Sequence, residues 1–148
     1  MTTTNTHTSS TELHALRITG EQIEHVAINT ADTVTAIQQA VGCRNFDVVN
    51  LDHDIDLFVD DEGLINGSEL NLFLTIIAHA LGRPAAIFGN AVALSIDPDT
   101  GDSLSLTPEQ QGRIIGVLAT KPDAALIDQV CDTLAPIPAA AAILRSMF

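Results

Sequence analysis

The chain has 148 residues, of which 46% are hydrophobic but only 3% are aromatic, and it contains no Trp or Tyr. That length fits one domain with a core of aliphatic side chains, in which the five phenylalanines are the largest members. Six Lys and Arg residues against 19 Asp and Glu residues give a formal net charge of −13. Because so acidic a surface repels nucleic acid and anionic membranes, we expect neither as a direct partner and look instead to basic partners.

The cysteines and the start of the chain indicate a cytoplasmic protein. Cys43 and Cys131 form no CxxC or Cys/His zinc pattern, so we expect both to be reduced, buried thiols. The first residues lack the basic and apolar regions of a signal peptide. The longest apolar run, residues 72–81, is interrupted by Thr75 and His79 and is too short to span a bilayer.

The first segments of the chain predict a leader followed by a hairpin. Residues 1–11 are rich in Thr, Ser and Asn and have almost nothing to bury, so they predict a flexible leader. Residues 13–18 and 22–28 have the composition of two strands. Gly20 lies between them and supplies the permissive backbone of a hairpin turn.

A helix and a second pair of strands follow. Asn29 and Thr30 can cap a helix whose apolar residues recur at helical spacing, and Gly42 ends it. Residues 46–51 and 55–59 then read as two further strands.

The middle of the chain predicts a turn, an apolar helix and a long extended segment. The turn falls at residues 61–63, and the helix runs from 69 to 81 and ends at Gly82. Residues 85–96 are typical of a strand, with an irregularity at Gly89.

The next helix has the strongest local signal in the sequence. Thr107 is a good N-cap, Pro108 stands where a missing N–H costs nothing, and Gln110 completes a Thr-x-x-Gln capping box. We expect this helix to run from Pro108 to about Ala119.

The residues from Lys121 onward predict a helical extension. Pro122 begins a helix with one apolar face, made by Leu126, Ile127, Val130, Cys131 and Leu134. Pro136 and Pro138 separate it from a short Ala-rich helix over residues 139–148. Either both helices pack back on the sheet, or the last one forms an oligomer or partner surface through Ile143, Leu144, Met147 and Phe148.

Together the elements predict an α+β fold. We expect a mainly antiparallel sheet of about four or five strands with helices packed on one face. Residues 1–11 would be the leader, residues 12–120 the core domain and residues 121–148 the helical extension.

The order of these elements and three segments resemble a known family. The segments are Val59-Asp60-Asp61-Glu62-Gly63, Ile87 to Leu94, and the turn-and-cap segment from Asp97 to Gln110. They are similar, over Ala15 to Ala119, to an uncharacterised family, the domain of unknown function numbered 3846. That family occurs in phages, plasmids and integrated elements, so the resemblance implies a mobile-element origin. It assigns no chemistry and carries over no catalytic residue.

The candidate functional surface is the acidic run that follows the third predicted strand. If residues 55–59 form a strand, Asp52, Asp54 and Asp56 lie on one face with their carboxylates about 6.5–7 Å apart. That spacing is close to twice the ~3.4 Å between phosphates along one DNA strand, so the run could mimic DNA and occupy a basic groove. A solvated strand end that protects the sheet edge is the alternative. The candidate partner-binding residues are Asp52, Asp54, Asp56, Asp60, Asp61 and Glu62.

A second possibility is a sponge protein that sequesters an anionic, nucleotide-like small molecule. Such a site would gather the scarce positive charges, because guanidinium groups bind phosphate and carboxylate in bidentate fashion. The candidate ligand-binding residues are Arg44, Arg83 and Arg113.

A third possibility is a metal-dependent enzyme of phosphoryl chemistry, with Mg²⁺ held by Asp52 and Asp54 near His53. The run does not continue as a calcium loop, because Leu57 and Gly63 occupy the positions that need Gly and Glu. No second carboxylate pair can be assigned to the same site. The prediction is therefore no metal, no cofactor and no catalytic residue.

Three common signatures of enzyme active sites are absent from the sequence. It has no phosphate-binding loop, no Gly-x-Ser-x-Gly elbow and no His-Glu-x-x-His. We therefore expect a binding protein rather than an enzyme. In this interpretation it is a phage- or plasmid-borne accessory protein in the host cytoplasm, which binds and modulates a host protein through its acidic surface. A defence or transcription component is the kind of target we expect.

Overall fold

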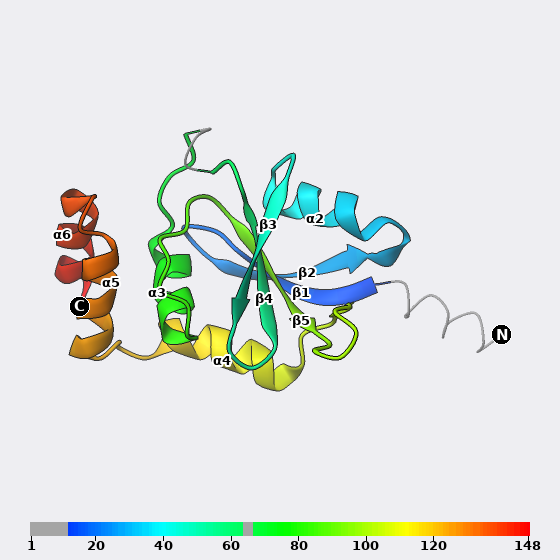
Figure 1. Ribbon diagram of the computed structural model, residues 1–148. Helices are drawn as coiled ribbons and strands as arrows, with labels where there is room; N and C mark the ends of the chain where they lie inside the picture. The colour runs from blue at the N-terminus through cyan, green and yellow to red at the C-terminus, as the bar shows by residue number, and fades with distance from the viewer. Residues whose placement is uncertain (1–11, 64–66) are drawn as a thin grey trace.

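The computed structural model describes residues 12–63 and 67–148, so the predicted leader lies outside the described residues. Its centre is one antiparallel sheet with the strand order β2-β1-β5-β4-β3, and a short sixth strand pairs with the end of β5 (Figure 1). The strands are β1 (Glu12–Ile18), β2 (Ile23–Asn29), β3 (Phe46–Leu51), β4 (Ile55–Asp60), β5 (Ala91–Ile96) and β6 (Ser103–Leu104).

A short 3₁₀ turn, η1 (Thr30–Asp32), and five α-helices complete the described fold. The helices are α2 (Thr33–Val41), α3 (Leu72–Ala80), α4 (Pro108–Ala119), α5 (Ala124–Thr133) and α6 (Pro138–Met147). The predicted α+β class with a mainly antiparallel sheet is therefore confirmed. No helix among the described residues is long and apolar enough to cross a membrane.

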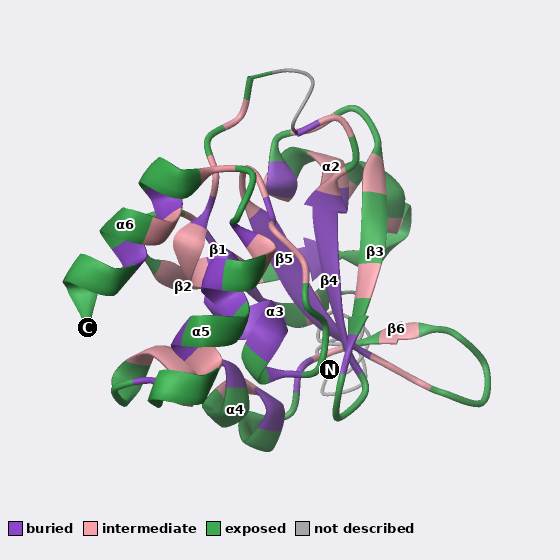
Figure 2. Ribbon diagram, turned by 60° about the vertical axis from the view of Figure 1, so that its left-hand side comes forward, coloured by how far each residue is buried: buried purple, intermediate pink, exposed green. Residues whose placement is uncertain are grey.

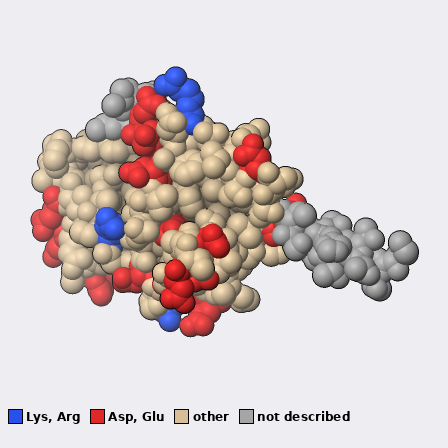
Figure 3. Space-filling model, turned by 45° about the vertical axis from the view of Figure 1, so that its right-hand side comes forward, with Lys and Arg blue, Asp and Glu red and all other residues tan. Residues whose placement is uncertain are grey.

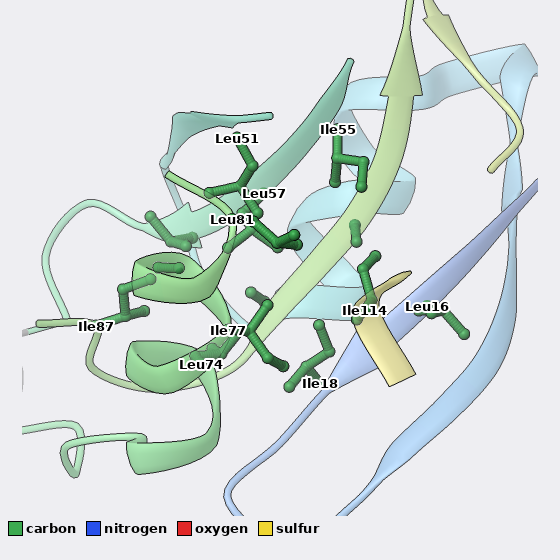
Figure 4. Packing of buried hydrophobic residues seen from close by; sticks show 14 of the residues in the cluster. Leu16, Ile18, Leu51, Ile55, Leu57, Leu74, Ile77, Leu81, Ile87 and Ile114 are labelled. Atoms are coloured by element: carbon green, nitrogen blue, oxygen red, sulfur yellow. The ribbon is translucent and has the colours of Figure 1, made fainter. Parts of the chain in front are cut away.

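The main core lies between the sheet and the helices α3 and α4. Leu16, Ile18 and Leu57 from the sheet meet Ile77 of α3 and Ile114 of α4 there, and all five side chains are fully buried (Figure 4). Burial of each such side chain stabilises the fold by about 1.5–3 kcal/mol relative to leaving it exposed.

Helix α2 packs on the opposite face of the sheet, so the helices are not confined to one face as the sequence predicted. Ile37 and Val41 of α2 form a second buried cluster with Phe58, Val92 and Leu94. As a result β4 and β5, two of the three strands with a neighbour on each side, are buried on both faces (Figure 2).

Most local signals in the sequence act as predicted. In α4 the Thr107 hydroxyl accepts the Gln110 N–H at 3.1 Å, and the Gln110 side-chain oxygen accepts the Thr107 N–H at 3.0 Å. Gly42 ends α2 in the left-handed conformation at φ 84°. Asn71 caps α3, which begins at Leu72 rather than at residue 69 because the preceding residues stay extended along the 85–90 segment.

The two C-terminal helices form an outer layer beyond α3. Ile76 of α3 packs against Ile127 and Val130 of α5, and α6 adds Ala140 and Leu144 to the same cluster. Leu144 is fully buried, so the predicted contact surface on α6 lacks this side chain. Packing on α3 fixes one face of α6 and leaves the opposite face outward.

Candidate binding surface

The turn between β3 and β4 displays two carboxylates in a fixed conformation. His53 and Asp54 are both left-handed, at φ 65° and 58°, and the turn is three residues long, because Leu51 pairs with Ile55 across it. The Asp52 N–H donates to the Leu81 carbonyl at 2.8 Å, which ties the turn to the end of α3. Asp52 and Asp54 are both exposed.

Gln110 of α4 holds this turn against the sheet. Its buried side-chain amide donates to the His53 carbonyl at 2.8 Å, the Asp54 carbonyl at 3.2 Å and the Ser95 hydroxyl at 3.0 Å. The Ile96 N–H also donates to the Asp54 carbonyl, at 3.0 Å. The capping glutamine of α4 therefore joins three elements at one end of the sheet.

The turn between β5 and β6 lies next to the β3–β4 turn, because Ile96 pairs with Asp54 just before β5 ends. Its backbone is braced internally. The Asp99 N–H donates to the Asp97 carboxylate at 2.9 Å, and the Gly101 N–H donates to the Asp97 carbonyl at 2.8 Å. The carboxylates of Asp99 and Asp102 point to an exposed surface of this turn.

The two turns together form a surface that we call the acidic end, defined by Asp52, Asp54, Asp97, Asp99 and Asp102. The lower side of the molecule, on which Figure 1 draws the β3–β4 turn and α4, carries several carboxylates close together (Figure 3). Glu109 of α4 stands one residue before Gln110 and pairs with Arg113 at 3.4 Å. Sequence reasoning found only half of this surface, since residues 97–102 were assigned to a structural turn.

Asp56 does not belong to an exposed stripe, contrary to the prediction. It is 4% exposed, and its carboxylate accepts a hydrogen bond from the Asn50 side-chain amide at 2.7 Å. The physical reason is that β4 is covered on both faces, so alternation along this strand does not separate buried from exposed positions. With Asp52 and Asp54 in the turn before β4, the predicted DNA-like spacing of carboxylates does not form.

The remaining predicted acids lie at the opposite end of β4. The Asp60 carboxylate accepts the Glu62 N–H at 2.9 Å, and Glu62 pairs with Arg44 at 3.3 Å. Six residues of extended chain separate these acids from Asp54, which corresponds to about 20 Å. The predicted single acidic run is thus two separate clusters.

A pocket of about 710 Å³ opens beside this second cluster, between α2 and the end of β4. Its lining includes Cys43, Arg44, Asp60 and Glu62. Burial raises the pKa of the Cys43 thiol above its usual value, and the charges of Asp60 and Asp61 raise it further. The thiol is therefore protonated at neutral pH, which is the opposite of what a nucleophilic cysteine needs.

The three predicted ligand-binding arginines do not share a site. Arg44 stands just before β3, whereas Arg83 lies two residues after Leu81, whose carbonyl accepts the Asp52 N–H at the other end of the same hairpin. Arg113 lies on α4 and pairs with Glu109. No group of three or more His, Cys, Asp or Glu side chains within residues 12–63 and 67–148 is arranged to hold a metal ion.

Comparison with known families identifies one domain in this chain. The family model described as Domain of unknown function (DUF3846) matches residues 13–119. The chain belongs to the DUF3846 family. No curated protein and no solved structure matches the chain.

Both turns of the acidic end lie inside the DUF3846 domain, as does the Gln110 side chain that joins them. Helices α5 and α6 lie beyond the matched residues. The candidate binding surface therefore lies within the matched domain, and the outer helical layer lies outside the matched residues.

Proposed function

We propose that this protein acts by binding a partner protein with a basic surface through its acidic end. The observation that carries the proposal is that two turns, far apart in sequence, are joined by hydrogen bonds at the Asp54 carbonyl and carry five carboxylates between them. A preorganised surface loses little conformational entropy on binding, and clustered charge of one sign steers an oppositely charged partner toward it.

The carboxylates of the acidic end are also absent from the ion pairs seen among the described residues. Four ion pairs occur among the described residues, and their carboxylates are Glu24, Glu62, Glu109 and Asp128. The carboxylates of the acidic end take part in none of these four pairs. Their negative charge is therefore available to lysine or arginine side chains of a partner.

The partner we propose is a protein of the host cell. The mobile-element origin implied by the family resemblance supports a host target, such as a defence or transcription component, which the protein would modulate by occupying a basic surface. The scattered arginines give no support to a site for an anionic small molecule. The proposed role is binding and not catalysis.

The proposal is tested by quantitative affinity capture from host cells with three forms of the protein. The acidic-end variant carries Asp54→Asn, Asp99→Asn and Asp102→Asn, which keep the turn backbone because asparagine tolerates the same conformations. The matched control carries Glu21→Gln, Asp47→Asn and Asp132→Asn, three exposed acids away from both acidic clusters, and so has the same net charge.

The wild type and the control should capture the same protein, and the acidic-end variant should bind it about ten-fold more weakly. This factor corresponds to three charge contacts of about 0.5 kcal/mol each. Binding should also weaken as salt rises, because salt screens exposed charges. An equal loss of affinity in both variants would show that only the net charge of the protein matters and not the position of the acids. No loss of affinity in either variant would overturn the proposal.

A further inference from the structure

The outward face of α6 carries an apolar stripe that no other element covers within residues 12–63 and 67–148. Ala139, Ile143 and Met147 recur at every fourth position and therefore lie along one side of the helix. All three are exposed, Ile143 by 54% and Met147 by 44%. The adjoining side of α6, with Ala140 and Leu144, is buried in the cluster that α6 forms with α5 (Figure 2).

The charge of the chain limits what can cover this stripe. Two copies that each carry a net charge of −13 repel one another, and most contacts between them would oppose carboxylates. The sequence from Thr133 to Phe148 contains no Asp or Glu and one basic residue, Arg145. The α6 stripe is therefore a surface on which two copies can meet with apolar contact and without like-charge repulsion.

The surroundings of α6 also favour one direction of pairing. Its C-terminal end borders a groove of about 650 Å³, where Glu21 and Glu69 lie with Met147. Its N-terminal end begins at Pro138, which has no N–H, and the Ala140 and Ala141 N–H groups donate to the Ile137 carbonyl; this end carries the positive end of the helix dipole. An antiparallel pair places the positive end of one helix beside the glutamates of the other, whereas a parallel pair would bring both pairs of glutamates together.

We propose that the α6 stripe binds a second copy of this chain, in an antiparallel α6–α6 contact centred on Ile143. The small side chains of Ala139 and Ala142 allow the two helices to approach closely. A contact of one short helix on another is small beside a standard interface of about 800 Å² per partner, so the dimer forms in the micromolar range. This inference is independent of the acidic end, which lies on other elements (Figure 1).

The test measures the mass of the full chain by analytical ultracentrifugation from about 1 to about 200 µM. The wild type should shift from 15.6 kDa toward twice that mass, and added salt should favour the dimer because it screens repulsion between the copies. Ile143→Glu should raise the dissociation constant at least ten-fold. Ile115→Glu is the matched control, since Ile115 is an isoleucine on α4 with 40% exposure, and it should dimerise like the wild type.

A wild type that stays monomeric over this range would overturn the proposal, and so would an Ile143→Glu variant that dimerises normally. The direction is tested by cysteine cross-linking in a Cys43→Ser background. Ile143→Cys should form a symmetric disulfide dimer and Ala139→Cys should not, because an antiparallel pair separates the two copies of residue 139. Cross-linking through residue 139 would contradict the antiparallel arrangement.

Discussion

Replacing Gln110 by alanine should destabilise the protein and loosen the acidic end together. The side chain makes four polar contacts: its amide donates to the carbonyls of His53 and Asp54 and to the Ser95 hydroxyl, and its oxygen accepts the Thr107 N–H. An amide has two N–H groups, so the three donor contacts count as about two full hydrogen bonds. With the capping contact, about three bonds at ~1 kcal/mol each predict a loss of about 3 kcal/mol.

The assay is urea unfolding followed by far-UV circular dichroism, because the chain has no Trp or Tyr for fluorescence. At about 2–4 °C per kcal/mol, the same loss should lower the melting temperature by about 6–12 °C. Gln111→Ala is the control, since that side chain is partly exposed and makes one longer contact, to the Leu106 carbonyl at 3.3 Å. If Gln110→Ala, like Gln111→Ala, lost less than about 0.5 kcal/mol, it would behave as an ordinary surface substitution, and the bracing role of Gln110 would be refuted.

Three further predictions concern other positions. Gly82→Ala and Gly101→Ala should each cost about 1–3 kcal/mol, because φ is +95° and +79° at these glycines. Only Gly82→Ala should also displace a side chain, the exposed Asp52 carboxylate, which would lie 2.5 Å from the new Cβ. A variant as stable as the wild type in urea unfolding would contradict the backbone strain. Asp61→Asn should lower the pKa of the Cys43 thiol and speed its alkylation at fixed pH, whereas Asp132→Asn should leave the rate unchanged. Hydrogen bonds from the Thr35 hydroxyl, and secondly from the Thr35 N–H, hold the pKa of Asp32 below 3.8 in the folded protein. The ionised Asp32 carboxylate therefore stabilises the fold above pH 3.8, and this stabilisation is lost as the pH falls through the folded pKa. The advantage of the wild type over Asp32→Asn in thermal unfolding should therefore shrink below that pH, and an advantage that grew there would show the opposite sign.

The local signals in the sequence were sufficient for the elements but not for their arrangement. The capping box of Thr107 and Gln110, and the end of α2 at Gly42, depend only on residues within one helical turn. Both can therefore be predicted from the local sequence. The side of the sheet covered by α2 depends on long-range packing of Ile37 and Val41, which local patterns do not encode. This explains why the helices were predicted on one face and are found on both.

The same limit applies to the candidate site. Asp56 looked exposed because it alternates with apolar residues, but its face of β4 is closed by contacts with elements far along the chain. The pairing of Ile96 with Asp54 brings residues 97–102 beside the β3–β4 turn, and no feature of either segment alone predicts that contact. A paired-position signal between these two turns, such as co-variation across the family, is the kind of evidence that could have located it.

The central claim is that the acidic end contacts the basic partner, and zero-length carbodiimide cross-linking of the captured complex tests it most directly. This chemistry joins a carboxylate to a lysine in contact with it, and mass spectrometry then identifies both residues. We predict cross-links from Asp54, Asp99 or Asp102 to lysines of the partner. Cross-links confined to Asp61 and Glu62, at the other end of β4, would contradict the claim and move the binding surface to the second cluster.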